Sequence, residues 1–138
     1  MAERVDGPAI ARQLLEQSPF ARYAGFELEA LEPDRATLRL PFKTELTTTG
    51  EIVHGGAISA LMDMAATIAA WSIEFESMPT RWGTAGLTVG FERPASSADV
   101  SATATITRRG RSLCFCEVVA SADGKRVAGG SVIYALSL

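Results

Sequence analysis

The residues of this chain that could carry out chemistry lie together between positions 54 and 63. Asp63 is the one formally charged residue between Glu51 and Glu74, and the apolar residues around it indicate the middle of a buried helix. A buried carboxylate without partners is costly, so a hydrogen-bond network or a function must compensate for it. A carboxylate in such a place can act as a general base or as a nucleophile. We therefore take Asp63 as the candidate catalytic residue.

The segment His54-Gly55-Gly56 stands at the start of the same predicted helix. The first backbone N–H groups of a helix have no acceptor within it and carry a partial positive charge. Two glycines let a ligand approach this backbone, which suits a carbonyl oxygen that gains negative charge during acyl transfer. A second interpretation stays open, in which the glycines serve only the dihedral angles of a loop-to-helix junction. His54, the only histidine, is a candidate general base or a residue that holds the turn by hydrogen bonds.

Composition argues against several other classes of function. One histidine and two cysteines, Cys114 and Cys116, do not supply a metal site, and no Gly-x-Ser-x-Gly motif is present. The net charge of −3 argues against a general nucleic-acid binder. The charged N-terminus lacks an apolar signal core, and Asp63 lies near the centre of the longest weakly charged run, residues 52–73, so neither a secretion signal nor a membrane span is predicted. With free thiols expected as well, we predict a cytoplasmic protein.

The hydrophobic pattern predicts one domain over residues 1–138, with an N-terminal helical segment within residues 1–18. Alternation of apolar and polar residues predicts strands, and the stretch 54–71 predicts a long helix that is apolar on all sides. The expected elements are a helix at 8–17, strands at 26–31 and 35–42, the long helix, and strands at 84–91, 99–107, 112–121 and 126–136. The turn 108–111, with Gly110 at positive φ, and the turn 122–125 connect the last three strands.

These elements predict an α+β fold in which a strongly curved antiparallel sheet wraps around one long central helix. A single sheet leaves part of such an apolar helix uncovered. The sequence therefore also predicts a dimer or a larger assembly.

The segment from Gly50 to Ala65, GEIVHGGAISALMDMA, resembles the signature of hotdog-fold acyl-CoA thioesterases of the phenylacetyl-CoA thioesterase (PaaI-like) group. The spacing from His-Gly-Gly to Asp is the specific part of this resemblance. The rest of the chain supports it through the segments 19–28, 91–95, 108–111 and 123–125. The resemblance implies the hotdog fold and an active site shared between the two subunits of a homodimer, with dimers commonly paired into tetramers.

The resemblance also implies roles for individual residues. Asp63 is the catalytic carboxylate, as base or nucleophile, and the N–H of Gly55 polarises the thioester carbonyl. Thr84 on the third strand of the fold assists the water or the acid. The family has an Asn in the loop before the histidine, where this chain has a threonine: Thr48 when counted from His54, Thr47 when counted from Gly50. His54 and Gly56 complete the expected substrate-binding segment.

The resemblance implies hydrolysis of an acyl-CoA thioester to a carboxylic acid and coenzyme A, without a cofactor or a metal. Two alternatives stay open: an acyl-thioester hydratase on the same fold, and a non-catalytic acyl-CoA binding protein. Arg108, Arg109 and Arg111 lie in one predicted turn and are candidates for the phosphates of coenzyme A. Solvated hairpin turns also favour charge without any ligand. We expect neither a nucleic-acid partner nor a membrane partner.

Overall fold

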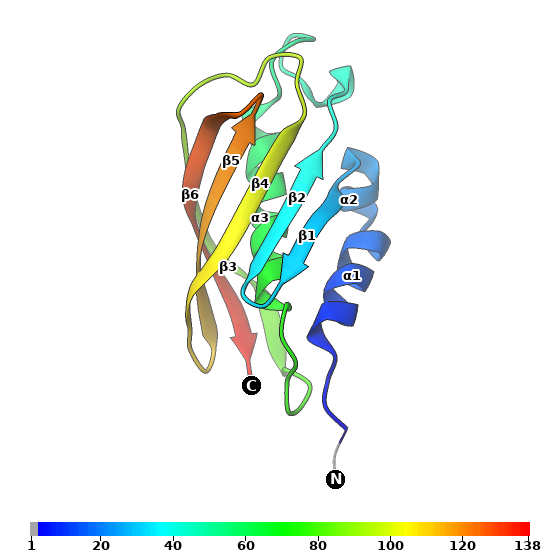
Figure 1. Cartoon of the computed structure of the whole chain (residues 1–138), viewed down its shortest axis with the longest axis vertical. Helices are drawn as coiled ribbons and strands as arrows, with labels where there is room; N and C mark the ends of the chain where they lie inside the picture. Colours follow the sequence, from blue (N-terminus) through cyan, green and yellow to red (C-terminus); the bar gives the residue numbers. More distant parts are fainter. Residues whose placement is uncertain (1–2) are drawn as a thin grey trace.

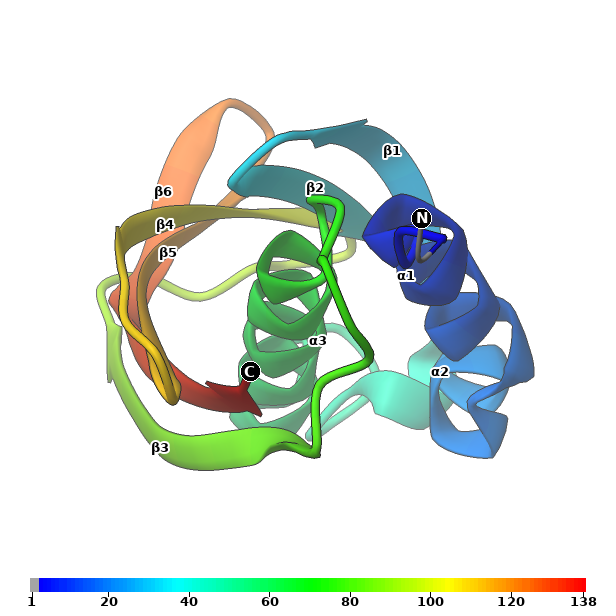
Figure 2. The same ribbon diagram turned by 90° about the horizontal axis from the view of Figure 1, so that it is seen from below.

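One sheet of six antiparallel strands curves around a long central helix, as Figures 1 and 2 show. The computed structural model describes residues 3–138. The strands follow the order β1-β2-β4-β5-β6-β3 across the sheet, so β1 and β3 are its edges. The helices are α1 (Gly7–Gln17), α2 (Pro19–Ala24) and α3 (Gly55–Ala70), with a short 3-10 helix η1 (Thr44–Leu46). The strands are β1 (Glu27–Glu32), β2 (Arg35–Leu40), β3 (Arg81–Phe91), β4 (Val100–Arg109), β5 (Leu113–Ala122) and β6 (Lys125–Ser137). The predicted α+β hotdog architecture is confirmed.

The central helix α3 has a buried face and a half-buried face. Side chains that pack against the sheet are fully buried, among them Leu61, Met62, Ala65, Ile68 and Ala69. Half-buried residues recur every three or four positions, at Ala57, Ala60, Asp63, Met64 and Thr67, which places them on one side of the helix. Asp63 was expected to be buried, and the structure instead places it on this more accessible side. No helix within residues 3–138 is both long and apolar enough to cross a membrane.

The N-terminal segment contains a second helix that the sequence did not predict. The sequence predicted a helix only at 8–17 in this segment. In the structure Ser18 ends α1 and also caps α2, because its side-chain oxygen accepts a hydrogen bond from the Ala21 N–H at 3.2 Å. Proline is compatible with the first turn of a helix, so Pro19 starts α2 while it ends α1. Both helices lie beside the β1 edge of the sheet (Figure 2).

Two turns at the ends of the last strands were predicted with different success. Asp123 and Gly124 have φ values of 52° and 72°, as a two-residue hairpin turn requires, and they join β5 to β6 as expected. The turn at 108–111 was predicted with Gly110 at positive φ, and this prediction is wrong. The strand β4 continues through Arg109, and the Gly110 N–H donates to the carbonyl of Leu113 at 2.8 Å, which closes the hairpin without left-handed backbone.

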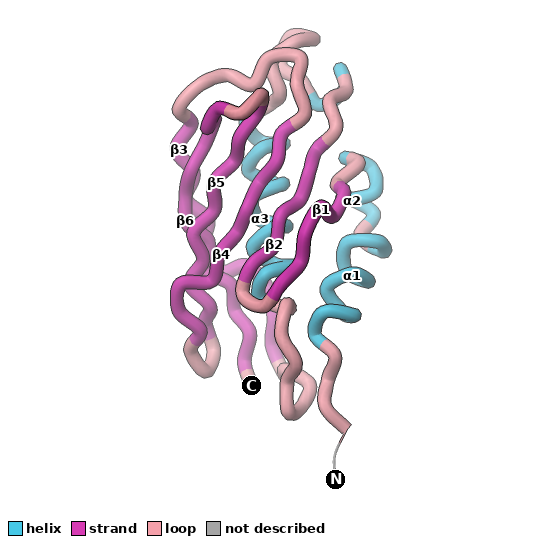
Figure 3. Tube along the Cα trace, viewed as in Figure 1, coloured by secondary structure: helices cyan, strands magenta, loops and turns pink. Residues whose placement is uncertain are grey.

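Two loops gather at the end of the sheet where α3 begins, as Figure 3 shows: residues 41–54 and residues 92–99. Backbone hydrogen bonds join them, from the Val53 N–H to the carbonyl of Ala95 at 2.9 Å and from the Ser97 N–H to the carbonyl of Glu51 at 2.8 Å. This pairing fixes the chain that leads into the first turn of α3.

Candidate active site

The structure brings Asp63 and Thr84 together, from the middle of α3 and from the edge strand β3. The Thr84 hydroxyl donates a hydrogen bond of 2.6 Å to Oδ1 of Asp63. The pairing of β3 with β6 shifts register between Thr84 and Gly86, a bulge that interrupts the alternation of side chains at this point. A hydroxyl that donates to a carboxylate orients it and stabilises its charge.

The wall behind this pair is aromatic. Tyr134 on β6 lies opposite Thr84 in the sheet, and its hydroxyl accepts a hydrogen bond of 3.0 Å from Nε1 of Trp71. Burial raises the pKa of Tyr134, and the negative charge of Asp63 raises it further. Tyr134 is therefore a neutral hydroxyl at physiological pH. Nothing in the sequence distinguishes Tyr134 from its neighbours, because the alternation of apolar and polar residues around it indicates only a core position.

At the start of α3 the structure leaves one backbone donor for a ligand. His54 is the N-cap residue, and its Nδ1 accepts a hydrogen bond of 2.8 Å from the Gly56 N–H. The carbonyl of His54 accepts from the N–H groups of Ala57 and Ile58. Within residues 3–138 the Gly55 N–H has no acceptor. The capping bond supports the structural interpretation of His54, because it needs Nδ1 as an acceptor and holds the turn.

The free N–H of Gly55 borders a groove of about 360 Å³. The groove is lined by Thr48, Ile58, Phe91 and Arg93 among others. A methyl group on Gly55 would lie 3.1 Å from Cζ of Phe91, so the ring of Phe91 covers this backbone closely.

Thr47 and Thr48 are the two candidates for the position of the family's Asn, and they differ in their contacts. Thr47 is committed to its own loop: its hydroxyl donates to the carbonyl of Thr44 at 2.7 Å and accepts from the Gly50 N–H at 2.8 Å. Thr48 lines the groove beside Gly55, and its hydroxyl donates only a longer bond of 3.4 Å to the carbonyl of Ile52. Gly56 has a separate constraint, since a methyl group there would lie 2.8 Å from Nδ1 of His54 and disturb the cap.

The acid and the free backbone donor of one chain are too far apart to act on one carbonyl group. Gly55 and Asp63 are eight residues apart in α3, and a helix rises about 1.5 Å per residue, so they are separated by about 12 Å. A carbonyl oxygen on a donor lies about 3 Å from it, and a water between the acid and the carbonyl carbon adds only a few ångströms more. The two groups of one chain therefore lie at separate places, and we refer to these two places as half-sites.

Within the described residues, neither the two cysteines nor a cluster of metal-binding side chains offers a second catalytic group. Burial raises the pKa of the Cys116 thiol to about 12, and it raises the pKa of Cys114 as well, so neither is a thiolate nucleophile at neutral pH. No group of three or more His, Cys, Asp or Glu side chains in residues 3–138 is arranged to hold a metal ion.

Comparisons with known proteins agree with this geometry. A family model described as the thioesterase superfamily matches residues 50–128, which include both half-sites. The chain belongs to the thioesterase superfamily. It is 27% identical over 124 residues to the medium/long-chain acyl-CoA thioesterase YigI of Escherichia coli, an alignment that covers 79% of each chain.

Solved structures of the superfamily share its hotdog fold. A thioesterase family protein from Silicibacter pomeroyi superposes with a TM-score of 0.86 at 25% identity, covering 96% of this chain and 98% of that one. A mutant of the phenylacetic acid degradation protein PaaI from Thermus thermophilus has a TM-score of 0.76 at 22% identity, covering 88% of this chain and 100% of the other, and it supports the fold alone.

The three arginines predicted to bind phosphate lie at the end of α3 opposite Gly55, and they differ in their contacts. Arg109 forms an ion pair with Asp34 at 2.8 Å and donates to the carbonyl of Ala70, in the last turn of α3, at 2.9 Å. Its side chain is only 19% exposed. This member of the thioesterase superfamily thus uses Arg109 to join the β1–β2 turn to the end of α3. Arg108 lies over the ring of Phe115, and Arg111 is exposed, so phosphate binding stays a prediction for these two.

Replacing Arg109 by Met should destabilise the fold by about 3 kcal/mol, because it leaves Asp34 and the helix carbonyls without their charged donor. Urea denaturation at fixed protein concentration measures this difference. The matched variant is Arg111→Met, whose side chain is exposed, and we expect a change within about 0.5 kcal/mol. Equal stability of the two variants would mean that Arg109 does not hold the end of α3.

Proposed function

We propose that this member of the thioesterase superfamily hydrolyses acyl-CoA thioesters to a carboxylic acid and coenzyme A, in the manner of the PaaI-like group. The observation that carries the proposal is the hydrogen bond between Thr84 and Asp63 on the accessible face of α3. It supplies an oriented carboxylate, and the Gly55 N–H supplies a donor for a carbonyl oxygen. The name of the Escherichia coli relative supports an acyl-CoA substrate.

The proposed reaction uses only groups of this chain and water. The Gly55 N–H and the positive end of the α3 dipole hold the thioester carbonyl oxygen, and they stabilise the negative charge that it gains. Asp63 then follows one of two routes. As a general base it takes a proton from water, and the resulting hydroxide attacks the carbonyl carbon. As a nucleophile it attacks that carbon itself, and water later cleaves the mixed anhydride. In both routes the C–S bond breaks and the coenzyme A thiolate takes up a proton.

The half-sites of two copies would assemble one complete site. The strand β3 is a long edge strand, and Trp82, Leu87 and Phe91 on it are 50%, 42% and 55% exposed. An edge with exposed apolar side chains is suited to pairing with another chain. Antiparallel pairing of two β3 strands about a two-fold axis would bring Gly55 of one copy beside Asp63 of the other. We therefore propose a homodimer with two shared sites, and pairing of dimers into a tetramer as the resemblance implies.

The remaining predicted residues fit this arrangement as proposals. Thr48 would take the place of the family's Asn beside Gly55, while His54 and Gly56 shape the helix start. Arg108 and Arg111 stay candidates for the phosphates of coenzyme A. The two free, buried thiols suit a reducing compartment, and we place the protein in the cytoplasm.

A thiol-release assay over aryl, short-chain and long-chain acyl-CoA esters tests this function. We expect free coenzyme A to appear with at least one class of ester. Tight binding of acyl-CoA without thiol release would favour the binding protein. Hydration of an enoyl-CoA without thiol release would favour the hydratase.

Replacing Thr84 by Val should lower kcat about tenfold, because the carboxylate stays but loses a charge-assisted hydrogen bond. Valine keeps the β-branched shape that the strand accommodates. The matched variant Thr105→Val, on an exposed position of β4, should keep the kcat of the parent protein. If Thr84→Val matches the parent as well, the hydroxyl has no part in orienting the acid.

A further inference from the structure

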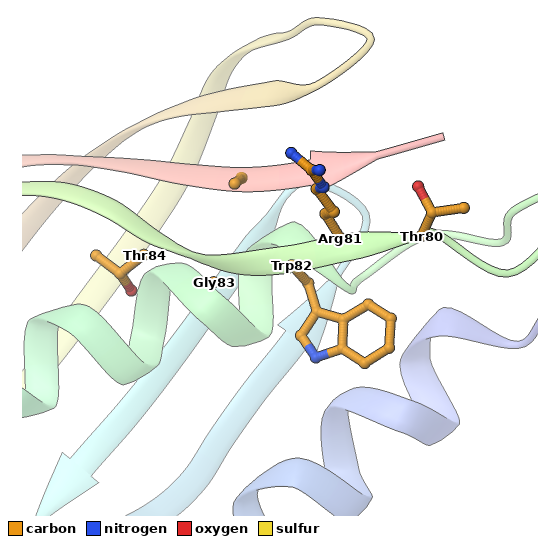
Figure 4. Close-up of a pocket in the computed structure, with 6 residues that line it drawn as sticks. Thr80, Arg81, Trp82, Gly83 and Thr84 are labelled. Carbon is orange, nitrogen blue, oxygen red and sulfur yellow. The ribbon is translucent and has the colours of Figure 1, made fainter.

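The hollow beside Thr84 lies open along one strand. It has a volume of about 510 Å³ and follows the chain from Thr80 to Thr84, with only Ala135 contributed by the neighbouring strand β6. Figure 4 shows Trp82 and Thr84 on one side of β3 and Arg81 on the other side. Because nearly all of its lining belongs to one edge strand, this hollow has no facing wall against which an apolar group could be buried.

The groove at Gly55 is instead built where four segments meet, and we call it the Gly55 groove. Its apolar lining comes from the loop before α3, the first turn of α3, the end of β3 and the loop after β3: Ile52, Val53, Ile58, Phe91, Pro94 and Ala95. Val53, Ile58 and Ala95 are buried and form the floor of the groove. The hydrogen bond of 2.9 Å from the Val53 N–H to the carbonyl of Ala95 joins the two loops at this floor. The groove therefore has an apolar floor that is already formed in the single chain.

The polar side chains of the Gly55 groove stand at its rim. Thr48, Glu92 and Arg93 complete the lining with Gly55, and all three are exposed. Glu92 is engaged in an ion pair of 2.5 Å with Arg126. The two amides of a pantetheine arm need hydrogen-bond partners when they are buried, whereas an acyl chain needs none. The apolar floor beside the Gly55 N–H therefore suits the acyl side of a thioester, and the polar arm is better placed over the rim or outside the groove.

Phe91 forms the outer wall of this groove. A methyl group on Gly55 would lie 3.1 Å from Cζ of Phe91, so the ring lies in contact distance of the start of α3. Ile58 lies three residues further along α3, on the same side of the helix as Gly55. An acyl group whose carbonyl oxygen rests on the Gly55 N–H thus starts between the ring of Phe91 and the buried side chain of Ile58.

We propose that the Gly55 groove binds the acyl group of the substrate, and that Phe91 makes the affinity depend on the length of that group. The inference rests on the proposed function, because the thioester carbonyl at Gly55 places the acyl group at the groove. A cavity of about 150 Å³ holds benzene, so a groove of about 360 Å³ accommodates a six-carbon acyl chain. Each methylene that is fully buried raises affinity about fourfold. The substrates expected from this lining are esters of apolar acyl groups.

A series of acyl-CoA esters tests the role of Phe91. We would measure kcat/KM for straight-chain esters of two to six carbons with the parent protein, Phe91→Ala and Phe91→Leu. In the parent the six-carbon ester should exceed the two-carbon ester by at least about tenfold, because four more methylenes are partly buried. Phe91→Ala removes one wall and should lower this ratio at least about threefold. Phe91→Leu keeps an apolar side chain and should lie between the two.

The matched control is Trp82→Ala. Trp82 is an aromatic residue on the same edge strand, and it is exposed to a similar extent as Phe91, but it does not line the Gly55 groove. We expect the ratio between the six-carbon and two-carbon esters to stay that of the parent. Light scattering verifies that the variants share the assembly of the parent protein. If Phe91→Ala alters that assembly, Phe91→Leu carries the test, since it keeps apolar bulk at the edge.

A binding series separates this inference from the proposed function. Acetyl-CoA, butyryl-CoA, hexanoyl-CoA and free coenzyme A are titrated by calorimetry against proteins that carry Asp63→Asn, with and without Phe91→Ala. Affinity should rise from acetyl-CoA to hexanoyl-CoA, and Phe91→Ala should reduce that rise while it leaves the affinity for free coenzyme A unchanged. This readout needs no turnover. A parent protein that releases no thiol contradicts the proposed function, and the binding series still tests the groove.

Three outcomes would overturn the inference. The first is an unchanged dependence on acyl length in Phe91→Ala, in kinetics and in binding. The second is a loss of affinity by the same factor for every ester and for free coenzyme A, which would place Phe91 against the pantetheine arm. The third is an equal loss of length dependence in Trp82→Ala, which would assign the effect to the edge strand as a whole rather than to the Gly55 groove.

Discussion

Asp63→Asn should lower kcat for thioester hydrolysis by at least about 10²-fold and leave the fold intact. The amide has nearly the shape of the carboxylate, and its oxygen can still accept the hydrogen bond from Thr84. Asp63 is half-buried, and this partner is a hydroxyl rather than a cation, so the substitution leaves no unpaired charge behind. An amide neither takes a proton from water nor attacks a thioester at neutral pH. Thiol release under saturating substrate measures the loss, and thermal unfolding verifies the fold.

The matched control for this substitution is Asp123→Asn. Asp123 lies in the exposed hairpin turn with φ at 52°, a conformation that asparagine also tolerates. We expect its kcat to equal that of the parent protein. A well-folded Asp63→Asn protein with full activity would remove this acid from the mechanism and, with it, the reason for assigning hydrolysis to this site.

The parts of this fold that could be predicted depend on local sequence patterns. An apolar run without proline predicted α3. An Asp-Gly pair between two segments of alternating apolar and polar residues predicted the β5–β6 hairpin. Asp63 was identified because it is the only charged residue in that apolar run. A charge among apolar side chains costs free energy, which a hydrogen-bond network or a function must offset. Thr84 was assigned by counting back along the sequence from Pro94, in the segment that resembles the family. In the structure its hydroxyl lies 2.6 Å from Oδ1 of Asp63.

The parts that could not be predicted depend on contacts between distant segments. Arg109 and Asp34 are 75 residues apart, and nothing in a charged turn distinguishes an arginine that caps a helix from one that is solvated. The alternation in β3 predicted a half-buried strand. Most of its residues are exposed instead, because β3 is an edge of the sheet and pairs only with β6 within the described residues. The alternation of apolar and polar residues shows which side chains lie on the same face of a strand. It does not show which other segment packs against that face.

Gly55→Pro should lower kcat about 10²- to 10³-fold, because it removes the one N–H assigned to the carbonyl oxygen. The substitution suits the backbone: Gly55 is the first residue of α3, where proline is favoured. His54 before it has φ −60° and ψ 132°, a conformation that proline tolerates in its predecessor. Gly55→Ala is the matched control, since it adds the same Cβ near Phe91 but keeps the N–H, and we expect at most a few-fold loss. Equal losses in both variants would assign the effect to the ring of Phe91 rather than to the donor.

A mixed dimer of Asp63→Asn and Gly55→Pro chains should regain about half of the parent activity, although each variant alone is nearly inactive. If each site takes its acid from one copy and its N–H from the other, the mixed dimer contains one site with both defects and one site with neither. Co-expression with two different affinity tags, followed by purification on both, enriches assemblies that contain both chains, and in a thiol-release assay only the mixed dimers among them can supply the recovered activity. If each site used Asp63 and Gly55 of one chain, every site in the mixed dimer would carry a defect and activity would not return. Because about 12 Å of helix separates the two groups within a chain, we expect the recovery.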